Sequence, residues 1–149
     1  NRRYLVEYLN KKMKIESQKF AVVLLDIDDF KSINDQYGHI YGDQTLQAFS
    51  DSMKKNMDNK GIVTRFGGEE FMLVFDDINH EVIEDTLNKV AEEFALYGKQ
   101  SKGIELSFSG GVEVFYQEDE IVKLFNRADH KLYYAKHTGK KKIVFDIDV

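Results

Sequence analysis

The strongest indication of the fold is the segment Ile62-Val-Thr-Arg-Phe-Gly-Gly-Glu-Glu-Phe-Met-Leu-Val-Phe75. Its two runs rich in β-branched and aromatic residues, 62–66 and 70–75, are typical of the strands of a β-hairpin. The Gly67-Gly68 pair between them favours a tight turn, because glycine accepts the positive φ that such a turn demands. A hairpin in the middle of a chain with helical segments elsewhere predicts an α+β fold. We expect a mixed, mainly antiparallel sheet surrounded by helices, and not a doubly wound parallel sheet.

Outward from the hairpin, hydrophobic periodicity predicts the element order α-β-α-α-β-β-α-β-α-β. The continuous apolar run at 20–25 is typical of a central strand that is covered on both faces. Gly110-Gly111 indicates a kink or bulge within a strand that we expect at 104–115. The other expected elements are helices at 3–14, at 29–37, from about Asp43 onward, after an Asn79 cap and at 121–135, and a closing strand at 142–147.

Length and composition exclude several classes of protein. With 149 residues and a hydrophobic fraction of 42%, we expect one domain over 1–149 with a substantial core. A net charge of −5 argues against broad binding to nucleic acid or anionic membrane, and the absence of cysteine excludes disulfides and thiolate chemistry. The longest apolar run, Phe20 to Leu25, is too short to span a membrane. Because the sequence opens on Asn1 instead of Met, we expect it to be a piece of a longer, multidomain protein.

Acidic residues mark the ends of the predicted strands. Asp26 follows the first apolar strand, Asp28 lies two residues further on, and Glu69 and Glu70 lie at the hairpin turn. If the hairpin lies beside the first strand, Asp26 and the glutamates converge, and their repulsion calls for a cation. Mg²⁺ shared with substrate phosphates fits this requirement, and two such ions suit in-line attack on a phosphoryl group. The alternative is structural: Asp-x-Asp often caps a helix or turn, and acidic Gly-Gly hairpins are often simple soluble turns.

Other polar residues accompany these acids in the sequence. Asn34 and Asp43 have the chemistry to read a guanine edge together, because an amide both donates and accepts while a carboxylate accepts from two N–H groups. Lys31 offers a point charge for phosphate. Helix capping is the alternative role for Asn34 and Asp43. The one basic cluster, within 136–142, is either a solvated surface or a cover over a triphosphate.

Three blocks of sequence, at 26–39, 42–43 and 65–71, resemble the GGDEF domain of diguanylate cyclases in order and spacing. The similarity extends from residues 1–4 to 135–139, nearly the whole chain. This resemblance implies a ferredoxin-like fold of the kind found in nucleotidyl cyclases and polymerase palm domains. It also implies a GTP-dependent nucleotidyltransferase of bacterial signal transduction, in which two GTP molecules condense into cyclic di-GMP and pyrophosphate is released. Each 3′-hydroxyl would attack the α-phosphate of the other GTP across a homodimer.

The resemblance further implies a magnesium site built from acidic side chains and one carbonyl. Two Mg²⁺ ions per active site, for which Mn²⁺ can substitute, would be bound by Asp26, the Ile27 carbonyl, Glu69 and Glu70. The expected catalytic residues are Asp26, Glu69 and Glu70, with Glu69 close to the attacking 3′-hydroxyl.

Nucleotide contacts are implied by the same resemblance. Asn34 and Asp43 match the residues that contact guanine, and Gly67 and Gly68 allow the backbone to approach ribose and phosphates. The residues that match triphosphate ligands are Lys31, Lys136 and Lys140.

Two other interpretations stay open. A catalytically silent GTP-binding module would regulate an attached domain, although intact Glu69 and Glu70 count against it. A pure protein-interaction domain would leave the acidic cluster unexplained. For either nucleotide-binding interpretation we expect a cytoplasmic location, on its own or as part of a membrane-bound protein. An upstream sensor or dimerisation domain is expected in the full-length protein.

The sequence departs from the family pattern at three places. The family often carries an Arg-x-x-Asp product-inhibition motif before the hairpin, and here Asp58 and Gly61 occupy its positions. Lys140 stands where the family often has arginine, and an ammonium lacks the bidentate fork of a guanidinium. The sequence also begins just inside the family's usual opening segment.

Because the product-inhibition motif is absent, we expect no tight binding of cyclic di-GMP at residues 58–61. Isothermal titration of the purified protein with cyclic di-GMP tests this. Micromolar binding that disappears when Asp58 to Gly61 are substituted would contradict the prediction.

Overall fold

The computed structural model describes residues 2–15, 19–115 and 120–147. Its helices and strands follow the order predicted from periodicity. They are α1 (Arg2–Met13), β1 (Ala21–Ile27), α2 (Phe30–Tyr37), α3 (His39–Asn56), β2 (Gly61–Arg65), β3 (Glu70–Phe75), α4 (His80–Lys102), β4 (Phe108–Val114), α5 (Ile121–His137) and β5 (Ile143–Val144).

One five-stranded sheet has the order β2-β3-β1-β4-β5. Every pairing is antiparallel except the short parallel pairing of β4 with β5. The mixed, mainly antiparallel sheet predicted from the hairpin is therefore confirmed. β1 lies at the centre, between the hairpin strand β3 and β4, which explains its continuous apolar sequence.

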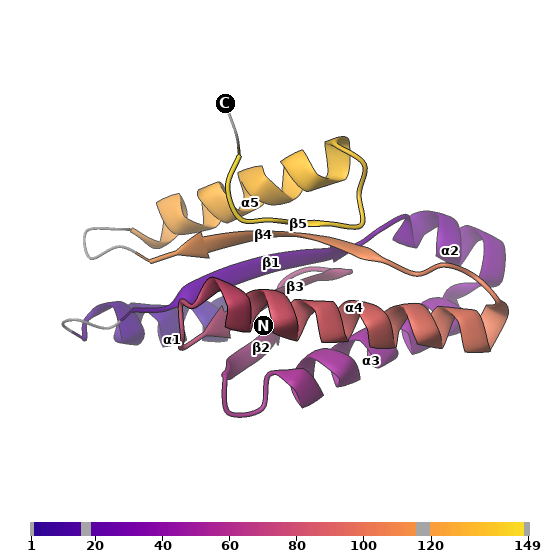
Figure 1. The fold of residues 1–149 in the computed structure, drawn as a ribbon, viewed down its shortest axis with the longest axis horizontal. Coiled ribbons are helices and arrows are strands. Elements are labelled where there is room, and N and C mark those ends of the chain that lie inside the picture. The colour runs from indigo at the N-terminus through magenta and orange to yellow at the C-terminus, as the bar shows by residue number, and fades with distance from the viewer. Residues whose placement is uncertain (1, 16–18, 116–119, 148–149) are drawn as a thin grey trace.

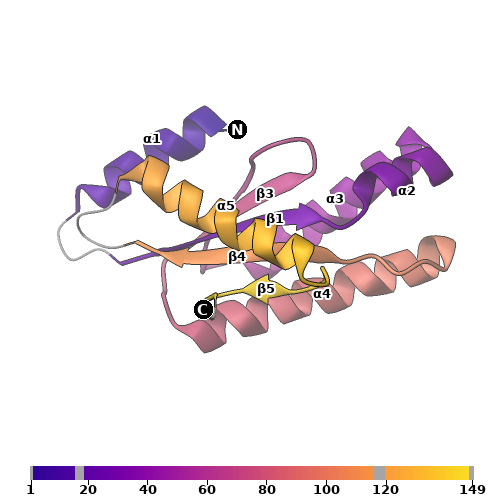
Figure 2. The ribbon, with the colours of Figure 1, turned by 90° about the horizontal axis from the view of Figure 1, so that it is seen from above.

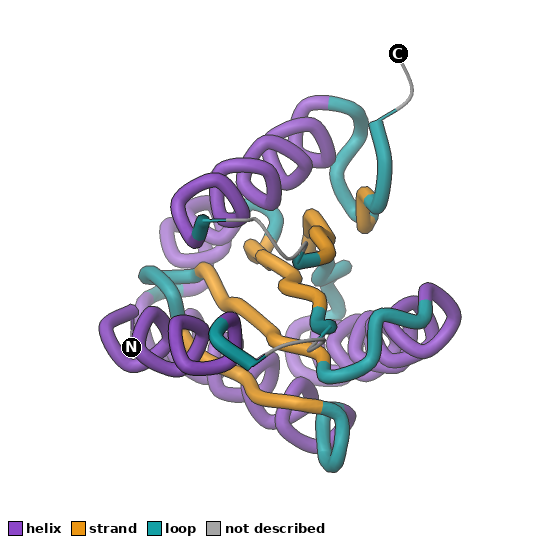
Figure 3. Tube along the Cα trace, turned by 90° about the vertical axis from the view of Figure 1, so that its left-hand side faces the viewer, coloured by secondary structure: helices purple, strands orange, loops and turns teal. Residues whose placement is uncertain are grey.

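Both faces of the sheet are covered by helices (Figure 1). Alternate residues of β1 enter two cores: Val23 and Leu25 join the core under α2, α3 and α4, whereas Val22 and Leu24 join the core under α1 and α5. Figure 2 shows α5 lying across β1 and β4 with α1 beside it, and Figure 3 shows helices on both sides of the strands. Burial on both faces follows from the period-two alternation of side chains along a strand.

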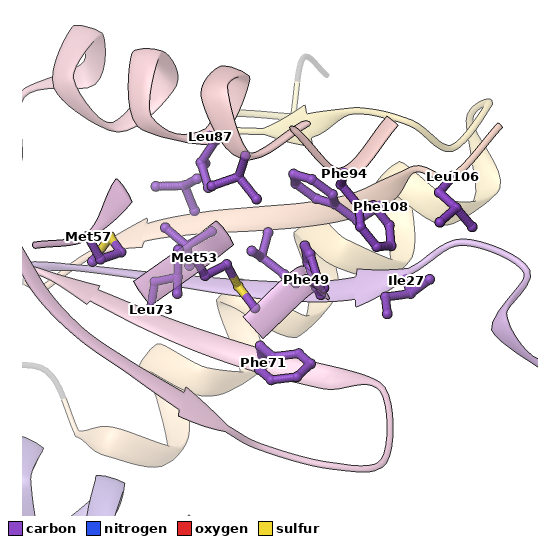
Figure 4. Packing of buried hydrophobic residues seen from close by; sticks show 14 of the residues in the cluster. Ile27, Phe49, Met53, Met57, Phe71, Leu73, Leu87, Phe94, Leu106 and Phe108 are labelled. Carbon is purple, nitrogen blue, oxygen red and sulfur yellow. The ribbon is translucent and has the colours of Figure 1, made fainter. Parts of the chain in front are cut away.

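The larger core is organised around an aromatic cluster. The Phe49 ring of α3 lies 5.4 Å from Phe71, 4.8 Å from Phe94 and 5.0 Å from Phe108, measured between ring centroids. These four residues come from two helices and two strands, so one ring connects both layers (Figure 4). Since Phe71 lies in the hairpin strand next to the acidic turn, this packing anchors the strand that carries Glu70.

Three predicted boundaries are wrong. The helix expected from about Asp43 begins at His39, because Gly38, at φ 89°, alone separates α2 from α3. The strand expected from Ile104 begins at Phe108. The closing strand expected over 142–147 is limited to Ile143–Val144, where it pairs with Gly110 and Gly111.

The expected bulge at Gly110-Gly111 is also wrong, since β4 pairs with β1 in unbroken register through both residues. Close packing explains the glycines instead. A Cβ on Gly111 would lie 2.4 Å from the Ala128 carbonyl oxygen and 2.7 Å from the Leu132 nitrogen, both in the backbone of α5. The missing side chain of Gly111 therefore allows α5 to pack directly on β4, whereas a Cβ on Gly110 would meet Leu25 and Ile143.

Gly111→Ala should destabilise the protein by about 2–3 kcal/mol, because the backbone of α5 cannot move aside without disturbing the smaller core. Thermal or urea unfolding measures the change. Gly68→Ala is the matched control, since a Cβ there has no atom within 4 Å, and its stability should stay close to that of the wild type. Equal stability of the two variants would contradict this account of Gly111.

Candidate active site

The acidic site is built by the pairing of β1 with β3. In the antiparallel register, Asp26 lies opposite Glu70, and the Ile27 N–H donates to the Glu69 carbonyl at 3.4 Å. The ends of these two strands therefore bring Asp26 and both glutamates into one neighbourhood. This is the convergence expected if the hairpin lies beside the first strand.

Burial and like charges disfavour ionisation in this neighbourhood. Burial raises the pKa of Asp26 from 3.8 to about 6, the Lys136 ammonium opposes that shift, and the charges of Glu69 and Glu70 add to it. Burial likewise raises the pKa of Glu70, and the nearby Asp129 and Glu69 carboxylates raise it further. A site at which carboxylates resist ionisation is one that gains from a bound cation.

Lys136 is the cation that the chain itself supplies. Its ammonium donates to the Ile27 carbonyl at 3.1 Å and to Asp28 Oδ1 at 2.9 Å, and it lies 3.3 Å from Asp26 Oδ1. One cation can thus contact Asp26 and the Ile27 carbonyl together. Part of the basic cluster is therefore committed to this site and is not only a solvated surface.

Asp28 has a different environment from Asp26. Its carboxylate is buried and accepts hydrogen bonds from Ser107 Oγ and Ser109 Oγ, both at 2.7 Å, and from the Lys141 N–H at 3.0 Å. Burial alone would raise the pKa of Asp28, but the hydrogen bonds from Ser109, Lys136 and Ser107 and the Lys136 charge outweigh burial and hold this pKa below its ordinary value. Asp28 therefore ties the end of β1 to the loop after α5, a role for which the distant serines gave no sequence signal.

The phosphate-binding candidates lie around the start of α2. Lys31 is exposed in the first turn of α2, and the Lys140 ammonium pairs with Asp29 Oδ1 at 2.6 Å. Asp29, at φ 57°, and Lys140, at φ 58°, both adopt the left-handed conformation, which non-glycine residues rarely do. Within the described part of the chain, no side chain caps the first turn of α2, so its end is suited to an anion.

The Asn34 side chain lies against Gly42, the residue before Asp43, and the sequence did not reveal the importance of this glycine. A Cβ on Gly42 would lie 1.7 Å from Asn34 Oδ1, so only glycine lets the Asn34 amide rest against α3. Among the described residues, Asn34 Oδ1 is buried without a hydrogen-bond partner, and Gly38 is the N-cap of α3. The capping alternative for Asn34 and Asp43 is therefore wrong.

Asp43 also lines a cleft of about 580 Å³ between α3 and the hairpin. The cleft combines polar and apolar walls, and its other lining residues are Tyr4, Leu46, Gln47, Ser50, Lys54, Val63, Thr64, Arg65 and Phe71. Its apolar walls suit the faces of a flat base, and Asp43 supplies an acceptor at its rim.

The hairpin turn is wider than expected. Gly67 and Gly68 are absent from the glycines with positive φ, which are Gly38, Gly61, Gly103 and Gly139 in the described chain. Residues 66–69 form a longer loop, which removes the demand for positive φ. Arg65, another residue the sequence reasoning passed over, donates from Nε to the Gly67 and Gly68 carbonyls at 3.2 and 3.1 Å and thereby holds the loop in shape.

Within residues 2–15, 19–115 and 120–147, no three His, Asp or Glu side chains are gathered into a site that could hold a metal ion alone. Carboxylates that share Mg²⁺ with a substrate need no such cage, because phosphate oxygens and water complete the coordination.

At the positions of the missing product-inhibition motif, Gly61 has φ 151°, and a Cβ there would lie 1.7 Å from the Val74 carbonyl oxygen. No described helix is long and apolar enough to cross a membrane.

Comparison with known proteins gives consistent matches. The family described as diguanylate cyclase, GGDEF domain, matches residues 1–142. Diguanylate cyclase DgcP of Pseudomonas aeruginosa is 33% identical over 124 residues, covering 82% of this chain and 18% of that protein. Probable diguanylate cyclase DgcF of Escherichia coli is 35% identical over 146 residues, covering 93% of this chain and 46% of that protein. The chain thus spans less than half the length of these relatives.

A solved structure shares the fold over almost the whole chain. The diguanylate cyclase SiaD of Pseudomonas aeruginosa, crystallised with its activator SiaC, superposes with a TM-score of 0.88 at 28% identity. The match covers 98% of this chain and 58% of that one.

The two acids at the end of β1 should have opposite effects on stability. The folded chain binds the Asp26 proton more tightly than the unfolded chain, so the stability due to this group falls as pH rises from 3.8 to about 6. Asp26→Asn should therefore raise the free energy of unfolding at pH 7.5 by roughly 1–3 kcal/mol in metal-free buffer. Asp28 has a lower pKa in the folded chain than in the unfolded chain. Its ionised carboxylate therefore stabilises the fold at any pH above the unfolded pKa, and this contribution is lost as pH falls through the folded pKa. Asp28→Asn should cost at least about 2 kcal/mol.

Urea unfolding in the presence of a chelator measures both variants at pH 7.5. A loss of stability in Asp26→Asn, or unchanged stability in Asp28→Asn, would contradict the opposite environments assigned to these acids.

Proposed function

Because this chain belongs to the GGDEF domain family, we propose that it condenses two GTP molecules into cyclic di-GMP and releases two pyrophosphates. The observation that carries the proposal is the register of β1 against β3, which sets Asp26 opposite Glu70 and beside Glu69. Three carboxylates so close together repel one another, and a shared cation would relieve that repulsion. Activity, substrate and partners of the longer protein are part of the proposal.

Magnesium fits the residues at the end of β1. The contacts of the Lys136 ammonium support this fit, because this one cation lies close to both Asp26 Oδ1 and the Ile27 carbonyl. In the proposal, Asp26, the Ile27 carbonyl and Glu69 bind one Mg²⁺, and Glu70 binds or positions a second. Bound Mg²⁺ would neutralise the charge that accumulates on the α-phosphate and favour the ionised 3′-oxygen. Mn²⁺, also a hard cation with oxygen ligands, would substitute.

Basic side chains and free backbone groups would hold the triphosphate. Lys31, Lys136 and Lys140 surround the first turn of α2, whose uncapped end favours an anion. Neither backbone conformation nor packing requires glycine at Gly68, since its φ is not positive and a Cβ there meets open space. A nucleotide lying against the turn would require it.

Guanine would bind in the cleft between α3 and the hairpin. The Asp43 carboxylate lines this cleft, whereas Asn34, with its Oδ1 buried and unpartnered against Gly42, is not among the lining residues. Both groups accept hydrogen bonds, and guanine presents a ring N–H and an amino group. Adenine lacks that ring N–H, so the same two acceptors would disfavour ATP.

The chemistry requires two copies of the site. In each half-reaction, the 3′-oxygen of one GTP forms a bond to the α-phosphorus of the other, and the bond from that phosphorus to pyrophosphate breaks. Glu69, next to the attacking hydroxyl, would accept its proton. Since each nucleotide is both nucleophile and electrophile, two domains must face each other, so we propose a homodimer, assembled by an upstream element. Because the proposed reaction consumes GTP, a cytoplasmic location is part of the proposal.

Purified protein at high concentration, with GTP and Mg²⁺, should form cyclic di-GMP detectable by chromatography. Glu69→Gln should lower turnover by about 10²–10⁴-fold, because it removes a metal ligand and a proton acceptor while preserving shape. Glu92→Gln, an exposed change on α4, is the matched control and should leave turnover intact.

If no product forms even when two copies are joined by a coiled coil, the proposal fails. Tight GTP binding without turnover would then identify a silent nucleotide-binding module. No GTP binding at all would leave a protein-interaction domain.

A further inference from the structure

The Lys136 ammonium occupies the position that the metal needs. It lies 3.3 Å from Asp26 Oδ1 and 3.1 Å from the Ile27 carbonyl oxygen, the two groups at the end of β1 that the proposed function assigns to Mg²⁺. A divalent ion bound to both oxygens at about 2.1 Å would lie within a few ångströms of the ammonium. The two cations would repel strongly in a site that is only partly exposed.

We propose that Lys136 is an internal competitor of the metal: in the nucleotide-free protein it holds Asp26 and the Ile27 carbonyl. A divalent ion displaces it only when a triphosphate offers the ammonium new anionic partners. The inference rests on the proposed function for the identity of the metal ligands. Its consequence is that metal and nucleotide bind together, so that metal without GTP finds the site closed.

Asp28 allows Lys136 to leave Asp26 without losing all of its carboxylate partners. Its carboxylate is fixed by Ser107, Ser109 and the Lys141 N–H, and the side chain is only 3% exposed. Lys136 donates to the same carboxylate at 2.9 Å. The ammonium can therefore leave Asp26 while it keeps Asp28, because a flexible four-carbon stem allows it to pivot about that contact. The Lys136 charge stays paired in both states.

Lys140 provides a matched comparison. It is a second lysine of the same basic cluster, but among the described residues its ammonium pairs with Asp29, at 2.6 Å, and with neither Asp26 nor Ile27. Removal of either lysine lowers the local positive charge by one. Only removal of Lys136 vacates the oxygens that the metal uses.

The test is titration of Mn²⁺ into nucleotide-free protein, with free Mn²⁺ measured by electron paramagnetic resonance. The wild type should bind Mn²⁺ weakly, and Lys136→Gln and Lys136→Met should each bind it at least about tenfold more tightly. Lys140→Gln should stay close to the wild type. Addition of Asp26→Asn to Lys136→Gln should abolish the gained binding, which places that binding at Asp26. Circular dichroism checks the fold of each variant. If only one Lys136 variant folds, its Mn²⁺ affinity is enough to test the inference.

Any of three results would overturn the inference. They are tight Mn²⁺ binding by the wild type, a failure of both Lys136 variants to bind Mn²⁺ more tightly than the wild type, and an equal gain of Mn²⁺ affinity in Lys140→Gln. These results are separate from the GTP assay. A protein that makes cyclic di-GMP but shows no gain in the Lys136 variants retains the proposed function and loses this inference. A protein that makes no cyclic di-GMP but shows the gain in Mn²⁺ binding retains this inference and loses the proposed function.

Discussion

The structure depends on one electrostatic constraint, the concentration of negative charge where β1 and β3 end side by side. Antiparallel register sets Asp26 against Glu70, and the turn adds Glu69. Burial makes these charges costly, so the pKa of Asp26 rises to about 6, although Lys136 opposes that rise. Much of the surrounding architecture serves to hold this arrangement. The aromatic cluster around Phe49 anchors β3, and the hydrogen bonds to Asp28 anchor the end of β1.

Glycines and strained residues shape the same region for different reasons. Gly111 allows α5, which carries Lys136, to pack on β4 at backbone distance. Gly42 makes room for the Asn34 side chain, and Gly68 leaves open space at the turn. Asp29 and Lys140 adopt left-handed conformations on either side of one ion pair. Such strain concentrated at one end of a sheet is typical of a binding site, where geometry takes precedence over local preference.

Much of the fold was predictable because each element has a strong local pattern. The apolar run of β1, the hairpin and the helical stripes all follow from side-chain periodicity, and the Asn79 cap is confirmed by its bonds to the Glu81 and Val82 N–H groups. Errors fell where a residue's role depends on distant neighbours. Gly110-Gly111 is typical of a bulge in sequence, but the strand is regular there, and the two glycines are explained by close packing, of Gly111 against α5 and of Gly110 against Leu25 and Ile143. The turn glycines lie in a wider loop than the Gly-Gly pair predicts.

In the candidate site, too, the residue types follow from local sequence, whereas their contacts depend on distant neighbours. From the sequence one can predict which residue types are available: acids at two strand ends, an amide and a carboxylate near Gly42, and a basic cluster close to the C-terminus. Only the tertiary structure decided that Lys136 reaches Asp26 and Ile27, and that Asp28 is bonded to Ser107 and Ser109 while Asp26 faces like charges. The physical reason is that ionisation and cation binding depend on burial and on neighbours within a few ångströms. Those neighbours are about 80 to 110 positions away in the chain, where no sequence periodicity records them.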